Sequence, residues 1–197
     1  MTKTYPASDA AILVDLGVRD LGESKDQEAR TKAAELARLP VRWHLVGRLQ
    51  TNKARSVAGY ATAVHSVDRV ELAEALARGC ARAARAQPLD VFVQLSFDGD
   101  PARGGAVVAD LPAIASAVAG RSELRLRGVM AVPPIGADPR AAFSRLAEVS
   151  ARLVAEHPHA SAISAGMSED LEAAVAAGST HVRVGSALLG RRDEEFS

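Results

Sequence analysis

The chain has 197 residues, which is enough for one domain with a sizeable hydrophobic core. Lys plus Arg and Asp plus Glu are equal at 24 each, so the formal net charge is zero, and this argues against a nucleic-acid-binding protein. No hydrophobic run approaches the roughly 20 residues that cross a bilayer, so a membrane protein is not expected.

Short apolar runs alternate with amphipathic segments along the chain, and this alternation predicts a parallel α/β fold. A stretch before Pro6 is interpreted as the end of one strand, followed by a helix that begins near Ser8. The other predicted strands are residues 18–21, 42–46, 63–65, 91–96, 124–132, 162–165 and 181–184. Eight such units make a (β/α)8 barrel of the TIM type, with a doubly wound sheet as the alternative.

Capping signals predict where three of the helices begin. Asp68, with Glu71 three residues later, resembles a capping box. Asp110 is a candidate N-cap for a helix that ends at Gly120. Asp138 precedes a proline, which is typical of a first helical position.

In a barrel of this kind the functional residues lie at the carboxyl ends of the strands. After the strand at 162–165, Gly166 permits a tight turn and Ser168 precedes a helix. Gly185 and Ser186 repeat this arrangement after the last strand. Two such helix starts predict a phosphate site, although both serines could simply be N-caps.

Three further side chains are candidates from their positions. Arg183, inside the last strand, either pairs with a structural carboxylate or points into the barrel mouth toward a ligand. His44 lies in the strand at 42–46, before a polar segment that lacks the Gly-Lys-Ser/Thr ending of a nucleotide-binding loop. Lys3, near the terminus, has no role by itself.

An ordered set of segments resembles one known family. The segments are Thr-Lys-Thr-Tyr-Pro-Ala-Ser at 2–8, Leu-Gly-Glu-Ser at 21–24, Trp-His-Leu-Val-Gly-Arg-Leu-Gln-Thr-Asn-Lys at 43–53, His-Ser-Val-Asp-Arg at 65–69, and Gly-Met-Ser-Glu-Asp-Leu-Glu-Ala-Ala-Val-Ala-Ala-Gly-Ser-Thr-His-Val-Arg-Val-Gly at 166–185. In this order they are similar to the pyridoxal phosphate homeostasis protein family, a single-domain relative of the barrel in alanine racemase.

The resemblance implies one barrel domain over 1–197 that carries pyridoxal 5'-phosphate. Lys3 matches the Schiff-base lysine of the family, and Arg183 matches the arginine that faces the pyridine nitrogen. The family's phosphate cradle corresponds to Ser168, Gly185 and Ser186, and His44 joins the candidate cofactor-binding residues. An arginine beside the ring nitrogen disfavours protonation of that nitrogen, which suits storage or delivery better than carbanion chemistry.

The sequence departs from the family pattern in two places. The family has an N-terminal helix and a complete first strand before the lysine, and here the helix and most of the strand are missing. Met1 stands where valine is usual, so we hypothesise a misplaced start site at a GTG codon. Ser24 stands where the family has asparagine.

The leading functional prediction is a non-catalytic carrier or buffer for pyridoxal phosphate, with recipient apo-enzymes as partners. It is expected to be a cytoplasmic monomer with no metal site, because no signal peptide and no cluster of metal ligands are evident. A pyridoxal-dependent amino-acid racemase is the alternative, and it needs a second proton-transfer group such as Tyr5. A truncated product that binds nothing is the third possibility.

Overall fold

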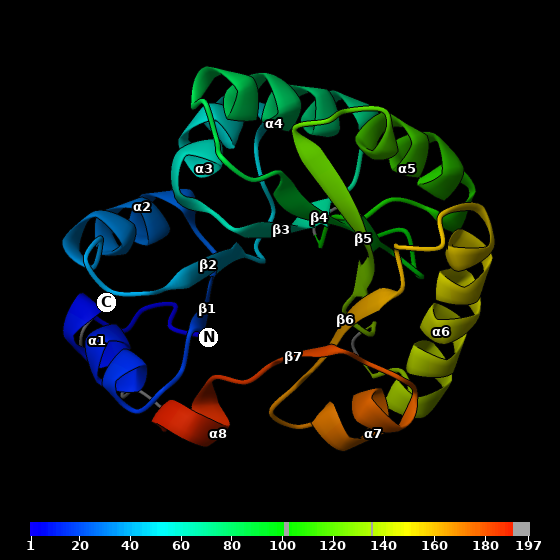
Figure 1. The fold of residues 1–197 in the computed structure, drawn as a ribbon. Coiled ribbons are helices and arrows are strands. Elements are labelled where there is room, and N and C mark those ends of the chain that lie inside the picture. Colours follow the sequence, from blue (N-terminus) through cyan, green and yellow to red (C-terminus); the bar gives the residue numbers. More distant parts are fainter. Residues whose placement is uncertain (101–102, 135, 191–197) are drawn as a thin grey trace.

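The computed structural model describes residues 1–100, 103–134 and 136–190. Its centre is a single sheet of seven parallel strands, paired in chain order from β1 to β7 (Figure 1). The strands are β1 (Asp20–Glu23), β2 (Arg42–Leu45), β3 (Ala63–Val67), β4 (Leu89–Leu95), β5 (Leu124–Ala131), β6 (Ala162–Met167) and β7 (His181–Arg183). Each overlaps a predicted strand, so the expected parallel α/β pattern is confirmed.

The helices lie outside the curved sheet and surround it, as Figure 1 shows. They are α1 (Ala7–Asp15), α2 (Asp26–Glu35), α3 (Ala54–Tyr60), α4 (Val70–Arg82), α5 (Leu111–Ala119), α6 (Pro139–Glu156), α7 (Leu171–Ala176) and α8 (Ser186–Leu189). Two 3₁₀ turns, η1 (Thr51–Lys53) and η2 (Val108–Asp110), precede α3 and α5. This arrangement of helices around parallel strands is that of a TIM-type barrel.

The first two residues of the chain occupy the space between β1 and β7. The backbone N–H of Thr2 donates to the carbonyl of Gly22 in β1, over 2.9 Å. The amino terminus of Met1 donates to the carbonyl of Val184, directly after β7, over 2.5 Å. The predicted eighth strand is therefore present only as this two-residue bridge, and the seven strands form a nearly closed barrel.

The main hydrophobic core lies between the sheet and the helices around it. Leu72 and Leu76 of α4 are fully buried there against strand residues such as Val91. Cys80 is buried in the same cluster, and burial raises the pKa of its thiol, in agreement with an unreactive core residue. A second, smaller apolar cluster inside the barrel includes Phe92.

The cap predictions have different outcomes. Asp138 accepts a hydrogen bond from the backbone N–H of Arg140 over 3.1 Å and caps α6 as predicted. The capping box at Asp68 is wrong, because Arg69 occupies the N-cap position and α4 has no side-chain cap. The Asp68 carboxylate instead accepts from Arg69 and from the N–H of Gly105.

Two other predicted boundaries need correction or qualification. Asp110 does hold the N-cap position of α5, but its side chain makes no capping bond. The first complete strand begins at Asp20 rather than Val18. Gly17, at φ +96°, turns the chain after α1, and the N–H of Val18 still bonds back to Leu13 over 2.9 Å.

Candidate ligand-binding site

Lys3 lies at the carboxyl end of the barrel, directly after the two-residue bridge. Its side chain is exposed, and the next residue, Thr4, has a φ of +68°. A left-handed conformation is uncommon for a β-branched residue and stores strain of order 1–3 kcal/mol. The N–H of Thr4 donates to Oε2 of Glu28 in α2 over 3.1 Å. The chain therefore turns sharply immediately after Lys3.

A buried ion pair fixes the residue before Lys3. Nζ of Lys32 in α2 lies 2.7 Å from Oε1 of Glu23 in β1, and both side chains are almost inaccessible to solvent. The same Nζ donates to the carbonyl of Thr2 over 2.7 Å, while the Thr2 hydroxyl donates to Glu23 Oε1 over 2.6 Å. Two charge-assisted bonds from this ion pair thus position Thr2, and the location of Lys3 follows from them.

The second oxygen of the Glu23 carboxylate, Oε2, is buried and has no hydrogen-bond partner among the described residues. Sequence reasoning missed this cluster, although Glu23 belongs to the Leu-Gly-Glu-Ser segment. A lysine on a helix normally reads as a solvated side chain, so Lys32 gave no separate signal.

The loops after β6 and β7 meet at Ser168 and Ser186. Neither serine is an N-cap, because Asp170 and Gly185 hold the N-cap positions of α7 and α8. Oγ of Ser186 lies 3.4 Å from Oγ of Ser168, which also accepts from the N–H of Ala187 over 3.3 Å. Gly166 makes the required turn at φ +94°, where an added Cβ would lie 2.6 Å from the Cβ of Ala174. Two hydroxyls and a backbone N–H therefore converge at this point.

Gly185 brings these loops to the beginning of the chain. A Cβ added to Gly185 would lie 3.2 Å from the Cβ of Met1, so the β7–α8 loop packs closely on the amino terminus. Tyr5 strengthens the same connection, because its hydroxyl donates to the carbonyl of Gly190 over 2.7 Å. The segment that carries Lys3 is thus held beside the loop that carries Ser186.

Arg183 turns its guanidinium into the barrel. Nη1 donates to both the carbonyl and the hydroxyl of Ser164, each over 2.9 Å, and Nη2 donates to the carbonyl of Ala131 over 3.1 Å. Burial lowers the pKa of Arg183 to about 10, against the opposing charge of Asp170, so it stays protonated at neutral pH. No carboxylate among the described residues forms an ion pair with Arg183. The alternative that Arg183 pairs with a structural carboxylate is therefore wrong for the described part of the chain.

His44 is placed apart from the other candidates. Nε2 of His44 lies 2.9 Å from Oδ1 of Asp20, and Nδ1 lies 2.9 Å from Nε2 of His65. Asp20 is the first residue of β1, so His44 faces the amino end of the barrel. The structure brings Lys3, Gly185, Ser186, Ser168 and Arg183 to the carboxyl end, but it connects His44 to them only through other side chains.

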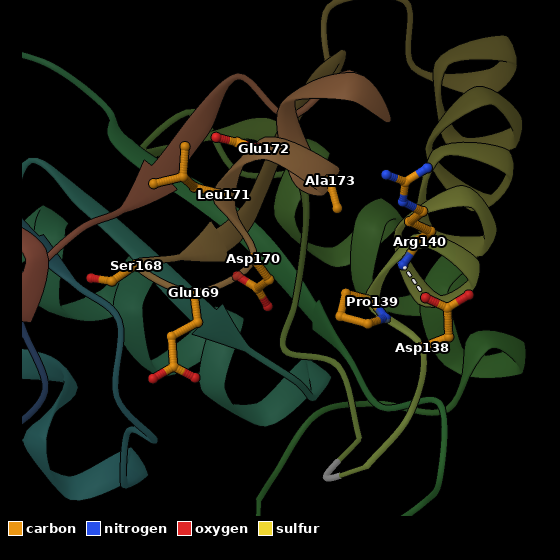
Figure 2. A pocket seen from close by; sticks show the side chains of 9 residues that line it. All are labelled: Asp138, Pro139, Arg140, Ser168, Glu169, Asp170, Leu171, Glu172 and Ala173. Atoms are coloured by element: carbon orange, nitrogen blue, oxygen red, sulfur yellow. Dashed lines mark hydrogen bonds between the residues drawn. The ribbon is translucent and has the colours of Figure 1, made fainter.

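A cavity of about 410 Å³ lies beside Ser168, between the segment that joins β6 to α7 and the start of α6 (Figure 2). Four carboxylates and one guanidinium line it, together with smaller side chains: Asp138, Pro139, Arg140, Ser168, Glu169, Asp170, Leu171, Glu172 and Ala173. Figure 2 shows the Ser168 side chain directed away from Asp138 and Arg140. The acidic lining disfavours the binding of an anion in this cavity.

The described residues hold no cluster of three or more metal-ligating side chains, and none of their helices is long and apolar enough to cross a membrane. A family model described as alanine racemase, N-terminal domain, matches residues 2–193. The chain is 47% identical over 206 residues to the pyridoxal phosphate homeostasis protein of Mycobacterium leprae, covering 96% of this chain and 80% of that protein. For the protein of the same name from Escherichia coli K12, identity is 39% over 203 residues, with 98% and 84% covered.

Solved structures show the same relationship. PipY of Synechococcus elongatus PCC7942 with PLP bound is 35% identical and superimposes with a TM-score of 0.87, covering 96% of this chain and 90% of that chain. An alanine racemase from Corynebacterium glutamicum is 14% identical, with a TM-score of 0.68 over 97% of this chain and 53% of that chain. The second similarity concerns the fold alone.

Proposed function

This chain belongs to the alanine racemase N-terminal domain family, and we propose that it binds pyridoxal 5'-phosphate through Lys3 as a non-catalytic carrier or buffer. The observation that carries the proposal is the convergence of Lys3, the Ser168–Ser186 hydroxyl pair and Arg183 at one end of the barrel. The names of the relatives and the PLP-bound PipY structure support the same ligand.

The chemistry of these groups fits the ligand. The primary amine of Lys3 can condense with an aldehyde, with loss of water. The hydroxyls of Ser168 and Ser186 and the N–H of Ala187 are the donors that a phosphate group accepts from. Nε of Arg183 makes no hydrogen bond within the described part of the chain, so it retains a donor for a ring nitrogen. Bound pyridoxal phosphate supplies an aldehyde and an electron-withdrawing ring.

The protonated guanidinium of Arg183 also indicates which chemistry is not favoured. A cation beside the ring nitrogen opposes protonation of that nitrogen and so weakens the ring as an electron sink. Demanding carbanion chemistry would need the opposite. Storage and delivery need only a reversible covalent attachment and a phosphate contact.

The alternative of a racemase requires a second proton-transfer group on the opposite face of the substrate. The hydroxyl of Tyr5 already donates to Gly190, and that of Tyr60 donates to Asp26 over 3.2 Å. Burial, together with the charge of Asp26, raises the pKa of Tyr60, so its phenol is a poor acid at neutral pH. These contacts favour the non-catalytic function.

In the same proposal, residues 1–197 act as one domain and the protein is a cytoplasmic monomer. It transfers its ligand to recipient apo-enzymes and binds no nucleic acid. The zero net charge supports the last point.

Transfer is the experiment that separates a carrier from an enzyme. The ligand-loaded protein is mixed with an apo-aminotransferase while free pyridoxal phosphate is removed by a scavenger. Recovery of aminotransferase activity, without any interconversion of L- and D-alanine by the loaded protein alone, is the expected result. Racemisation that disappears in a Lys3→Ala variant would overturn the non-catalytic assignment, and failure to reactivate the apo-enzyme would overturn the carrier.

A further inference from the structure

A line of polar side chains crosses the barrel interior from its amino end to Arg183. Oδ1 of Asp20 lies 2.9 Å from Nε2 of His44, and Nδ1 of His44 lies 2.9 Å from Nε2 of His65. Nδ1 of His65 lies 2.8 Å from Oγ of Ser164, which accepts from Nη1 of Arg183 over 2.9 Å. The line therefore joins five strands, β1, β2, β3, β6 and β7, through consecutive hydrogen bonds.

We propose that Asp20, His44, His65 and Ser164 act as positioning residues for Arg183, and that protonation of His44 is transmitted to the guanidinium through a tautomer change of His65. The consequence for the ligand rests on the proposed function, because it assumes that Arg183 faces the ring of pyridoxal phosphate. The line of hydrogen bonds itself is independent of that assumption.

The residues at the two ends of the line determine the direction in which its hydrogen bonds are donated. A guanidinium only donates and a carboxylate only accepts hydrogen bonds. Ser164 therefore accepts from Arg183 and has its own proton to donate to Nδ1 of His65. His65 then donates from Nε2 to His44, and His44 donates from Nε2 to Asp20. With both imidazoles neutral, Ser164, His65 and His44 each donate one hydrogen bond to the next residue in the line. The opposite tautomers would place a nitrogen lone pair of His44 against the carboxylate of Asp20.

Adding one proton produces a second complete arrangement. A protonated His44 donates from both nitrogens, so His65 must accept at Nε2 and carry its hydrogen on Nδ1. His65 then donates to Ser164, whose oxygen accepts from two sides and whose hydroxyl hydrogen turns to another acceptor. The contact that holds Nη1 of Arg183 is altered although no heavy atom has to move far.

Burial determines which histidine takes the proton. The His65 side chain is 2% exposed and stacks on Phe92 at 4.3 Å between ring centroids. Desolvation, with the charges of His44, Arg183 and His181, lowers the pKa of His65 well below its usual value. The side chain of Asp20 is 50% exposed, so His44 is the histidine nearest the solvent-accessible end of the line.

Other charged groups face the same end of the barrel. From β2, Arg42 donates to Oδ2 of Asp20 over 2.5 Å. Burial raises the pKa of Asp20, but the hydrogen bonds from Arg42 and His44 outweigh it and lower this pKa below its ordinary value. Asp90 of β4 pairs with Arg125 and Arg127 of β5.

His181 of β7 lies in the same interior, with its ring centroid 6.0 Å from that of His65. Burial, with the charges of His44 and Arg127, lowers the pKa of His181. Its Nδ1 forms a hydrogen bond with the hydroxyl of Thr180 over 2.7 Å. His181 is therefore a neighbour of the line and not one of its members.

The ligand-free protein gives the first test. With ¹⁵N-labelled histidine and arginine, the NMR shifts of the ring nitrogens distinguish the two tautomers of His65 while the pH is lowered from 8 to about 5. His65 should change from the Nε2–H to the Nδ1–H form with the same midpoint as His44, and the side-chain resonance of Arg183 should move with them. A His65 whose tautomer is unchanged while His44 titrates would overturn the proposal.

Matched variants test the coupling. Asp20→Asn removes the charge that favours protonated His44, so the shared midpoint should move to lower pH. Asp90→Asn makes the same change at the same end of the barrel without touching the line, and should shift it less. Ser164→Ala should leave the titration of His44 in place but abolish the response of Arg183; an unchanged response would contradict the proposed route.

The loaded protein separates this inference from the proposed function. The pH dependence of the visible absorbance of bound pyridoxal phosphate should shift with Asp20→Asn and less with Asp90→Asn. Binding without that differential shift would overturn the transmission to Arg183. Absence of binding would overturn the proposed function. The NMR titration of the ligand-free protein would still test the proposed coupling along the line from His44 to Arg183.

Discussion

Lys32 donates a hydrogen bond from its buried ammonium group to the backbone carbonyl of Thr2, over 2.7 Å, one residue before Lys3. The same ammonium pairs with Glu23. The position of Lys3, the proposed attachment site, therefore depends on an ion pair whose two side chains are only 8% and 0% exposed. Removing one member leaves the other charge buried and unpaired.

Lys32→Met should lower the free energy of unfolding by about 3–5 kcal/mol and weaken ligand attachment, because Glu23 and Thr2 lose their common partner. Urea denaturation and a pyridoxal phosphate titration measure the two effects. Lys25→Met is the matched control, since Lys25 is 75% exposed and only pairs with Glu28 at 3.9 Å. Equal stability losses in the two variants would refute the role assigned to the buried pair.

The Ser168→Ala/Ser186→Ala double variant should bind pyridoxal phosphate more weakly while folding normally. A hydrogen bond to a charged group contributes about 1.5–3 kcal/mol, so a loss of at least tenfold in affinity is expected. Fluorescence titration provides the measurement. Ser144→Ala, an exposed position on α6, should bind as the parent does. An unchanged affinity of the double variant would show that the phosphate lies elsewhere.

Protein stability should fall as the pH decreases below about 6.5. His65 and His181 have lowered pKa values in the folded chain, so the unfolded chain binds more protons in this range. Each such histidine contributes a slope of up to about 1.4 kcal/mol per pH unit, and its stabilisation is complete only above the unfolded pKa. His65→Gln should flatten the dependence measured by urea denaturation between pH 5 and 8. A parent stability independent of pH would disprove the assignment.

Gly128→Ala should destabilise the barrel by about 1–3 kcal/mol or more. Gly128 has a φ of +151°, and a Cβ there would lie 1.8 Å from the carbonyl oxygen of Ala162, so β5 and β6 would have to separate. In contrast, Gly59→Ala in α3 meets nothing within 4 Å and should stabilise by up to about 1 kcal/mol through helix propensity. Thermal unfolding of the two variants should therefore move in opposite directions.

The barrel was predictable because its strands are continuous apolar runs bounded by turns, a pattern that depends only on neighbouring residues. Local rules failed where a distant partner competed. Asp68 does not cap α4, since it bonds to Gly105, 37 residues away. The Ser168–Ser186 contact was predictable as well, because adjacent parallel strands end side by side.

The interior of the barrel could not be derived in the same way. His65 and Ser164 are 99 residues apart and on strands that do not pair, so no local pattern indicates that their side chains meet. His44 was grouped with the ligand site because it lies in a matching segment. Its two hydrogen bonds depend on the inward direction of three strands, which only the folded chain reveals.

Covalent trapping tests the central claim most directly. The protein is incubated with pyridoxal phosphate, reduced with borohydride, and digested, and the modified lysine is located by mass spectrometry. We expect one equivalent of label at Lys3, no label in Lys3→Arg, and full labelling of a Lys53→Arg control. Labelling scattered over several lysines, or unchanged in the Lys3→Arg variant, would contradict the assignment of Lys3 as the attachment site.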